Sequence, residues 1–508
     1  MEWWYACQNH RSNFYFQRGC ISLSKEQPVQ GSDHLSLAPS RSFGDTNWNR
    51  FWFGLGQGGE GIKTSALSSV LLFFYSQVLG LDPQLAGLAL LLAVASDGVS
   101  DILIGAWSDN LQHRWGRRHP LMYASILPFG LSFVALFMAP DALGQWGLFV
   151  WLLVAAVFAR NAMTLFVIPH YALGAELSQD YHTRTVINAW RTFFGYIGTG
   201  LVFLAGMYFF SASPDYPNGQ LDPSRYPTYG AVLGATIILM VFGSTLGTHN
   251  VIPHLAQPGL TERFSFVGAF VDTWQAARCR SFAIFLGAFL FYVTGLYVYK
   301  FMEIYLGTYF WRLDSGLVFL LPVVGVVAAL VATPMWTLIS FHIGKKATVV
   351  SGIFAGSSVY GLLVGAKTLG FLTDTMHAYV AFIFLGSFVA AMLLAAPTVI
   401  AGSMLADIAD EYELKSGLRR EGVIFGAINF ISKLSTGIGA QVAGVTIAAS
   451  GLVARADPAT VTVAMSNRLG VTTAFTYFTL AGLAALLFSI YPLSEARCAT
   501  IKLALAKK

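Results

Sequence analysis

The 508-residue sequence is short of charge and of cysteine. Only 11% of its residues are Asp, Glu, Lys or Arg, whereas 55% are hydrophobic; soluble domains carry about 25% charged residues. The 4 cysteines include no C-x-x-C pair that would indicate a metal or redox centre. Lys and Arg do not gather with aromatic residues on one polar surface, so the net charge of +5 does not indicate a nucleic-acid partner. These shortages exclude an ordinary soluble domain.

What the sequence has in abundance is apolar runs of about 20 residues, the length that crosses a bilayer. We expect an all-α membrane protein with twelve transmembrane helices, near 51–80, 84–107, 119–140, 146–173, 185–210, 228–249, 281–310, 314–340, 347–370, 375–405, 422–450 and 470–493. Gly116-Arg117-Arg118 follows the second run and Gly344-Lys345-Lys346 follows the eighth. This echo favours two six-helix halves, the arrangement of the major-facilitator fold.

The expected parts of the chain follow from this count. They are a polar and disordered leader (1–47), an N-terminal half (48–250), a cytoplasmic linker (251–280), a C-terminal half (281–495) and a cytoplasmic tail (496–508). The leader has no apolar h-region and is not a signal peptide. Lys and Arg concentrate in alternate connections, so the positive-inside rule places both termini in the cytoplasm. We expect a multi-pass protein of a bacterial-type inner or plasma membrane, with no obligate protein partner.

Two acids lie one helical turn apart in an otherwise lipid-soluble stretch. Asp97 and Asp101 share one helix face with Ser100, and each charge at mid-bilayer costs about 2.5–3.5 kcal/mol on insertion scales. Packing a helix bundle does not require that cost. The three oxygen-bearing side chains predict a site for a small hard cation. The alternative is that bases on neighbouring helices neutralise the acids.

Four stretches carry a family resemblance. They are LGQGGEGIKTSALSSVLLFFYSQVLGLDP, SDGVSDILIGAWSDNLQHRWGRRHP, IPHYALGAELSQDYHTRTVINAWRTFFG and DIADEYELKSGLRREGVIFGAINFISKLSTGIGAQVAG. Over roughly residues 50–495 the chain resembles the glycoside–pentoside–hexuronide:cation symporters, the group that contains melibiose permease. The resemblance implies a major-facilitator fold and transport of a sugar or glycoside with Na⁺ or H⁺, without a further cofactor.

The resemblance implies a cation site at Asp97, Ser100, Asp101 and Thr164, with Na⁺ on the two acids. Lys433 matches the family lysine that faces these acids. A lysine inside an apolar helix also needs a counter-charge on physical grounds alone. The alternative for Thr164 is a hydroxyl bonded to its own helix backbone, which is common in membrane helices.

The sugar site matches the family less well. Gly61 and Val167 stand where the family has its two sugar-binding acids, which puts a melibiose-like substrate in doubt. Tyr171 replaces a tryptophan and could stack on a sugar ring. Arg191 matches a family arginine and can fork hydrogen bonds to hydroxyls or a carboxylate; the alternative is an arginine that snorkels to the membrane surface.

One set of charges lies outside the family pattern. Glu60 and Lys63 are spaced i, i+3 on the first helix, and Lys300 and Glu303 have the same spacing on the seventh. Opposite charges at this spacing can pair within one helix. We hypothesise that these four residues bind the substrate in place of the missing acids. The alternative is that they are self-neutralised pairs without a ligand.

The turn after the second helix resembles the major-facilitator gating loop. Its predicted gating residues are Asp109, Arg114, Arg117 and Arg118. Charge-assisted bonds between such groups can hold helix ends together. The predicted partners of Arg419 and Arg420, or of the arginines of the N-terminal half, are Asp407, Asp410 and Glu411. The alternative is that the basic residues only set the topology.

The sequence therefore predicts cation-coupled symport of a sugar, glycoside or related small polar solute by alternating access, and no enzyme activity. The residues do not choose between Na⁺ and H⁺, although the count of oxygens slightly favours Na⁺. A cation-coupled lysophospholipid transporter is the alternative, since it suits the missing sugar-binding acids. A membrane-embedded prenyltransferase would need a second acidic motif, which no predicted span contains. A receptor without transport activity is a further alternative.

Overall fold

The computed structural model describes residues 46–506, apart from 141, 179, 256–277, 375 and 418–420. The chain divides into two compact units, Met1–Arg41 and Ser42–Lys508, and every described residue belongs to the second. Most of the predicted leader and linker, together with Arg419 and Arg420, lie outside the described residues. All regular elements within the described ranges are helices, which confirms the predicted all-α class.

The N-terminal half contains six long helices. The first is α1 (Asn47–Ser65), which runs on through the turns Ala66–Val70, Leu71–Phe73 and Phe74–Val78, two of them π-helical. The others are α3 (Pro83–Asn110), α4 (His119–Leu136), α5 (Gln145–Glu176), α6 (Tyr181–Phe209) and α7 (Tyr226–Gly247). Short 3₁₀ turns at Gly219–Leu221, Pro223–Arg225 and His249–His254 flank α7.

The C-terminal half repeats this plan. It contains α9 (Arg280–Tyr305, extended by a π-helical turn at Leu306–Phe310), α10 (Ser315–Ile343), α11 (Lys345–Thr368), α12 (Tyr379–Leu394), α13 (Ala396–Ser416), α14 (Glu421–Ser450), α15 (Val463–Ser489) and α16 (Glu495–Leu505). Because α12 and α13 together make one membrane-length element, Tyr379–Ser416, the half again has six spans.

The expected number of spans agrees with the structure. Eleven of the described helices are long and apolar enough to cross a membrane. The twelfth is the continuous helix 47–78, whose first part is rich in glycine and polar residues. Two details differ from the sequence prediction. The last span begins at Val463 rather than near 470, because Thr462 caps it. The tail also forms a helix, α16, capped by Ser494.

Local chemistry explains where the site-bearing helices begin and end. The Asp82 side chain accepts hydrogen bonds from the backbone N–H groups of Gln84 and Leu85, and Pro83 occupies the first turn of α3. Gly344 separates α10 from α11 with a φ of +79°, a backbone conformation that favours glycine. These boundaries fix which residues of α3 and α10 lie at mid-helix and which lie at a turn.

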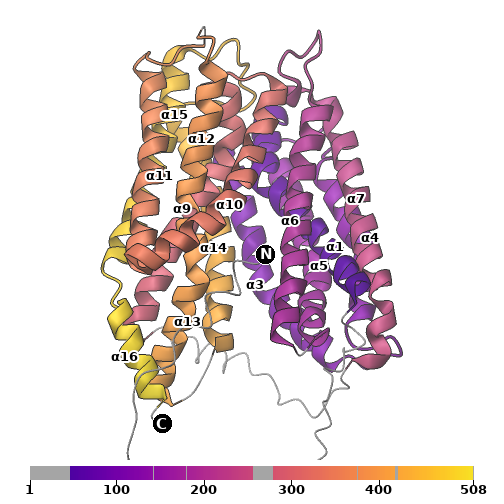
Figure 1. Ribbon diagram of the computed structural model, residues 1–508. Helices are drawn as coiled ribbons and strands as arrows, with labels where there is room; N and C mark the ends of the chain where they lie inside the picture. Colours follow the sequence, from indigo (N-terminus) through magenta and orange to yellow (C-terminus); the bar gives the residue numbers. More distant parts are fainter. Residues whose placement is uncertain are drawn as a thin grey trace, which may run out of the picture. The chain divides into compact units, whose positions relative to one another are not determined.

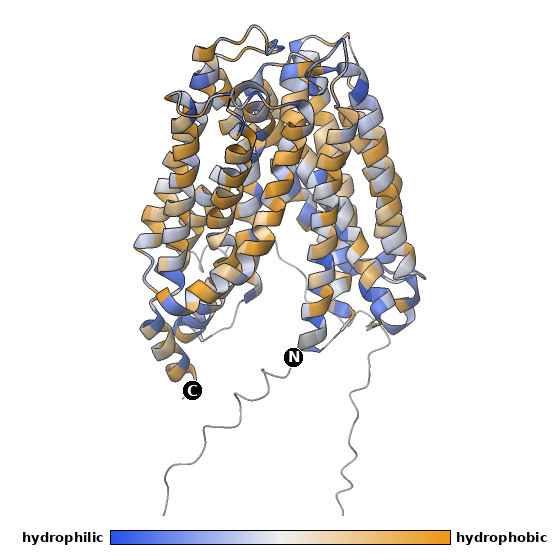
Figure 2. Cartoon of the chain, turned by 45° about the horizontal axis from the view of Figure 1, so that its top comes forward, coloured by the Kyte–Doolittle hydropathy of each residue, from blue (hydrophilic) through white to orange (hydrophobic). Residues whose placement is uncertain are grey.

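The two halves lie side by side, the first in indigo and magenta and the second in orange and yellow (Figure 1). We call the end that carries α16 and the α3–α4 and α10–α11 turns the α16 end. The other, which carries the connections 211–225 and 451–462, is the loop end. The ribbons of the two halves meet toward the loop end and diverge toward the α16 end (Figure 2).

The same change from close to open packing is found along α3 and α14, one helix from each half, which lie against each other. Toward the loop end, a Cβ atom added at Gly87 would lie 2.7 Å from the carbonyl oxygen of Ala440. Toward the α16 end, a Cβ atom at Gly426 would meet nothing within 4 Å. The backbones of α3 and α14 therefore approach each other closely toward the loop end, and Gly426 has open space toward the α16 end.

Candidate functional site

The two acids of α3 have different surroundings. Asp97 is only 1% exposed, whereas the Asp101 side chain is 24% exposed. Both face neighbouring helices of the bundle, as their spacing predicts. Asp97 meets α5, and Asp101 meets both α5 and α14.

Asp97 is held by an arginine that the sequence analysis did not single out. Arg160 of α5 donates from Nε to Asp97 Oδ2 at 3.0 Å, and its Nη2 lies 2.9 Å from the same oxygen. The other carboxylate oxygen, Oδ1, is buried and has no partner among the described residues. The signal for Arg160 was present in the sequence, since a charged residue inside an apolar span needs a counter-charge. The same argument had been applied to Lys433 alone.

Asp101 bridges the two halves. Its Oδ2 pairs with the ammonium group of Lys433 on α14, and its Oδ1 accepts a hydrogen bond from the Thr164 hydroxyl at 3.2 Å. Thr164 also lies 3.2 Å from the carbonyl oxygen of Arg160, so the predicted ligand geometry and the backbone-bonded alternative both describe this side chain. The structure thus brings Lys433 and Thr164 to the acids.

Ser100 lies differently from the other predicted cation ligands. Its hydroxyl donates to the carbonyl oxygen of Asp97, at 3.2 Å, within α3 itself. Within the described part of the chain, no cluster of three or more His, Cys, Asp or Glu side chains could hold a metal ion. Each acid of α3 is instead occupied by a base, which is the arrangement that the alternative interpretation of this pair predicted.

A cavity of about 150 Å³ adjoins the acids. Its polar lining comes from α1, α3, α5, α9 and α14 and includes Glu60, Lys63, Asp97, Arg160, Tyr297 and Lys433. Lys63 is 4% exposed. The cavity is therefore lined by acids and bases of the N-terminal half and by Lys433 of the C-terminal half.

Glu60 does not pair with Lys63. Its Oε2 accepts a hydrogen bond from the Tyr171 hydroxyl at 2.7 Å and another from the side-chain amide of Gln57. The Arg191 guanidinium lies over the Tyr171 ring, 4.3 Å from its centre, in a cation–π contact. The predicted substrate residues Glu60, Tyr171 and Arg191 thus form one cluster that joins α1, α5 and α6.

A second cavity, of about 370 Å³, lies on the other side of α1. Lys300 and Glu303 of α9 line it, and so do four tyrosines of the C-terminal half: Tyr292, Tyr299, Tyr360 and Tyr477. The Tyr360 ring makes edge-on contacts with Tyr299 and Tyr477, with ring centres 5.5 and 5.8 Å apart. The Tyr360 hydroxyl is buried without a hydrogen-bond partner among the described residues.

The four charges proposed as one substrate constellation are therefore divided between two cavities. The α1 pair lines the smaller cavity and the α9 pair lines the larger one, with Ser68 on the wall of both. No ion pair within 4 Å joins Lys300 to Glu303, nor Glu60 to Lys63, in this described part of the chain. Self-neutralisation within each helix, the alternative interpretation, is not observed.

The predicted gating residues form a cluster at the α16 end. Arg118 reaches Asp109 at 2.6 Å and Glu176 at 3.1 Å, and Arg117 reaches Glu176 at 2.7 Å. Glu176, at the end of α5, was missed because nothing in the sequence reports its distance from the turn. Arg114 lies instead over the Trp115 ring, 5.2 Å from its centre. The cluster joins α3, α4 and α5, all within one half.

The C-terminal half also has a cluster of ion pairs at the α16 end, made by other residues. Lys345, the first residue of α11, pairs with Asp407 of α13. Glu411 contacts Lys415 at 2.8 Å and Arg497 of α16 at 3.4 Å. The partners expected for Asp407 and Glu411 were Arg419 and Arg420, which are outside the described residues, or the arginines of the N-terminal half; the recorded pairs lie within the C-terminal half.

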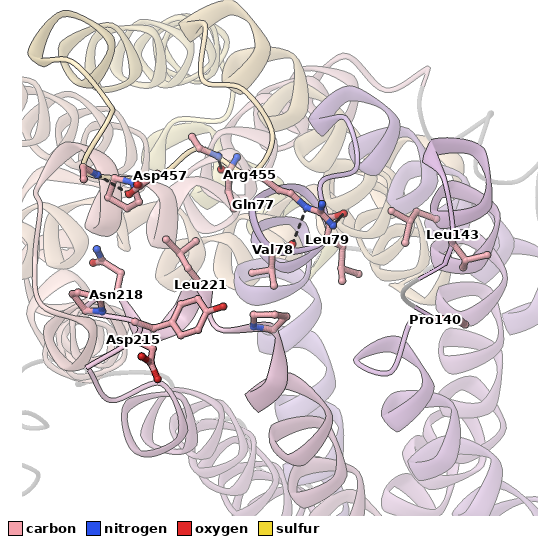
Figure 3. A pocket seen from close by; sticks show the side chains of 17 residues that line it. Gln77, Val78, Leu79, Pro140, Leu143, Asp215, Asn218, Leu221, Arg455 and Asp457 are labelled. Atoms are coloured by element: carbon pink, nitrogen blue, oxygen red, sulfur yellow. Dashed lines mark hydrogen bonds between the residues drawn. The ribbon is translucent and has the colours of Figure 1, made fainter. Parts of the chain in front are cut away.

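Contacts at the loop end cross from one half to the other. The Tyr309 hydroxyl donates to Gln77 Oε1 at 3.0 Å. Arg455 donates from Nε to the carbonyl oxygen of Val78 at 3.3 Å and from Nη2 to that of Leu79 at 2.9 Å. Figure 3 shows Arg455 beside these residues, at the edge of a cavity near the loop end. The two Arg455 bonds cap backbone carbonyls at the end of the helix 47–78.

Solved structures with a similar backbone are membrane transporters. A bacterial homologue of the human lysosomal transporter Spinster aligns with a TM-score of 0.63 at 14% identity, over 90% of this chain and 99% of that one. A D-xylose–proton symporter aligns with a TM-score of 0.60 at 15% identity, over 89% and 98%. At these identities the likeness shows the fold alone.

Relatives in sequence are named symporters or transporters. An uncharacterised symporter of Synechocystis is 27% identical, over 87% of this chain and 94% of its own length. The isoprimeverose transporter of Lactiplantibacillus pentosus is 25% identical, over 80% and 81%. A sodium-dependent lysophosphatidylcholine symporter of Danio rerio is 23% identical, over 89% and 87%.

One family model accounts for nearly all of the described chain. The model for MFS/sugar transport proteins matches residues 52–495, which include both halves and both cavities. The helical spans, the arrangement of the halves and the match agree with one another. The chain therefore belongs to the MFS/sugar transport protein family and is a multi-pass membrane transporter.

Proposed function

We propose that the protein is a cation-coupled symporter that moves a sugar or glycoside across the membrane by alternating access. The observation that carries this proposal is the ion pair between Asp101 of α3 and Lys433 of α14. It joins the two halves, and both of its residues lie inside their helices, away from the turns and loops. A cation that neutralises Asp101 would compete with Lys433, so ion binding and the contact between the halves are linked.

The larger cavity is the proposed substrate site. Its volume of about 370 Å³ falls in the range of small-molecule pockets, about 300–1,000 Å³. Tyrosine rings offer flat faces for a sugar ring and hydroxyls for its hydroxyl groups. Glu303 and Lys300 supply a carboxyl group and an amine that can bond the hydroxyl groups of a solute. A pyranoside or a disaccharide of pentose and hexose suits this lining.

The orientation that we propose puts the α16 end in the cytoplasm. Arg114, Arg117, Lys345 and Lys346 all lie at this end, as the positive-inside rule requires. With this orientation the sealed loop end faces outward, and the diverging ends of α3 and α14 face inward. Substrate release to the cytoplasm is the step that such an arrangement serves.

Uptake into proteoliposomes tests this proposal. Radiolabelled isoprimeverose and xylose would be offered with an inward Na⁺ gradient, an inward proton gradient or neither. We expect accumulation of at least one of them under one ion gradient. The matched pair of variants is Asp101→Asn and Asp215→Asn, since Asp215 is an exposed carboxylate at the loop end. Accumulation that survives Asp101→Asn would contradict the proposal.

A second candidate substrate is a lysophospholipid. The Danio rerio relative is named for that activity, and apolar side chains such as Phe203, Leu296, Val326 and Leu394 line part of the larger cavity. Competition separates the two candidates. Lysophosphatidylcholine below its micellar concentration should leave sugar uptake unchanged if the cavity is built for a polar solute.

A further inference from the structure

The ion site of this transporter already contains a cation that belongs to the protein. We propose that the guanidinium group of Arg160 occupies the ion position at Asp97 and makes the site refractory to Na⁺. This inference rests on the proposed function only in that a coupling ion is used at all. It disagrees with the sodium site on Asp97 and Asp101 that the sequence predicts.

The first argument is the contact itself. Two nitrogens of Arg160 lie within 3.0 Å of one carboxylate oxygen of Asp97. The Asp97 residue is 1% exposed and Arg160 is 7% exposed. Arginine stays protonated in proteins, so this cation cannot be removed by deprotonation. A sodium ion at Asp97 would have to displace a guanidinium group that has little water nearby to receive it.

The second argument is the balance of charge around the acids. Arg160, Lys63 and Lys433 all line the small cavity beside Asp97. The other acid that lines this cavity, Glu60, accepts hydrogen bonds from Tyr171 and Gln57, and Asp101 is paired with Lys433 beside it. Three bases from α1, α5 and α14 thus already balance the three acids. A further fixed cation would add an uncompensated charge to a poorly hydrated space.

The third argument concerns the oxygens that a sodium ion would need. Hard cations in proteins take several oxygen ligands at once. The Ser100 hydroxyl points to the backbone of its own helix, and one oxygen of Asp97 and one of Asp101 are taken by bases. Thr164 is already bonded to Asp101. Among the oxygens of these two carboxylates, only Asp97 Oδ1 has no partner within the described residues, and the Ser100 and Thr164 hydroxyls are oriented by the bonds that they donate.

Thermal unfolding of the purified protein tests the proposal without any sugar. The melting temperature would be followed as Na⁺ replaces choline at constant ionic strength. We expect no Na⁺-specific shift for the wild type. Arg160→Gln removes the tethered charge and should create a saturable rise of about 2 °C or more at Na⁺ a hundredfold above its Kd. Adding Asp97→Asn to Arg160→Gln should abolish that rise.

Arg160→Lys is the matched control. It keeps a positive charge beside Asp97 but loses the planar fork, so it should stay insensitive to Na⁺ as the wild type does. A sodium response in Arg160→Lys as large as that of Arg160→Gln would show that fork geometry, not charge, excludes the ion and would overturn the proposal. A folded Arg160→Gln variant without a response would overturn it as well.

Direct binding of ²²Na⁺ to the wild type covers the case in which Arg160→Gln does not fold. We expect no saturable binding that Asp97→Asn or Asp101→Asn removes. Saturable binding that either variant removes would overturn the proposal. Sugar uptake driven by Na⁺ in proteoliposomes would overturn it too, yet would support the proposed function. Failure of every sugar to be transported would instead sink the proposed function and leave this inference standing.

Discussion

The two cavities on either side of α1 differ in almost every respect except their shared wall at Ser68. The smaller is crowded by six charged side chains, three acids and three bases if Asp101 is counted with its partner Lys433. The larger carries one acid and one lysine among tyrosines, serines and apolar residues. Charges that neutralise one another suit an ion-linked switch, whereas aromatic rings with unpaired polar groups suit a solute. On the function proposed above, this difference would place ion coupling at the smaller cavity and solute binding at the larger one.

The largest effect is expected at Asp101. Changing Asp101 to Asn removes the partner of Lys433 and the linkage between an ion and the halves. Accumulation against a gradient should fall about 100-fold, near the upper end of coupling energies between two sites. Exchange of labelled for unlabelled sugar without a gradient should persist, which separates lost coupling from misfolding. Equal loss of exchange would show that Asp101 is needed for sugar movement itself, and would contradict the division of ion coupling and solute binding between the two cavities.

Glu303→Gln should weaken sugar binding in the larger cavity. Leaving a buried hydrogen-bonding group without its partner costs about 1–3 kcal/mol, so KM for the transported sugar should rise about 5- to 100-fold. The ion dependence of uptake should stay as it is in the wild type. Initial rates over a range of sugar concentrations provide the measurement. An altered ion dependence with an unchanged KM would assign Glu303 to the ion side instead.

Tyr360→Phe should have a smaller effect of the same kind. The buried Tyr360 hydroxyl has no partner within the described residues, so it is placed to bond a ligand. Losing one neutral hydrogen bond of about 0.5–1.5 kcal/mol predicts a rise in KM of about 2- to 10-fold. The melting temperature of the sugar-free protein should not fall, because no protein contact is lost. A clear fall would indicate a structural hydroxyl.

The smallest effect is expected at Arg114. This side chain contacts a tryptophan ring rather than an acid, and exposed changes of this kind stay within about 0.5 kcal/mol. Arg114→Gln should leave uptake within about twofold of the wild type. Its matched variant, Arg118→Gln, breaks contacts with Asp109 and Glu176 and should slow uptake more. Equal rates in the two variants would remove Arg118 from the gating cluster.

The sequence was most informative where a charged residue lies inside an apolar span, because burying it there costs free energy. Asp97, Asp101 and Lys433 were found because each lies inside an apolar run, and the structure brings all three to one place. Arg160 obeys the same rule and was passed over, so the argument had been applied to too few residues. The i, i+3 pairs were less informative, since spacing along a helix shows what can meet and not what does.

Other features depend on how helices turn toward one another. The tyrosine-lined cavity draws its rings from α9, α11 and α15, which are apolar on most sides, so no periodic pattern points its tyrosines inward. The orientation of Ser100 is set by a bond within its own helix. Glu176 contacts a turn 58 residues away in sequence. These side-chain orientations and contacts depend on how the helices pack, which the spacing of residues along the chain does not determine.

Arg455 holds the two halves together at the loop end through a single side chain. Its φ of +56° is an uncommon conformation for a side-chain-bearing residue, and Gly80 leaves the room that its side chain fills, with a Cβ there 2.7 Å from its Nε. Arg455 is thus held with slight backbone strain, and its partners are the main-chain carbonyls of Val78 and Leu79, which no side-chain substitution at those two positions removes. This contact between the halves can therefore be changed through Arg455 itself or through Gly80, which leaves room for its side chain.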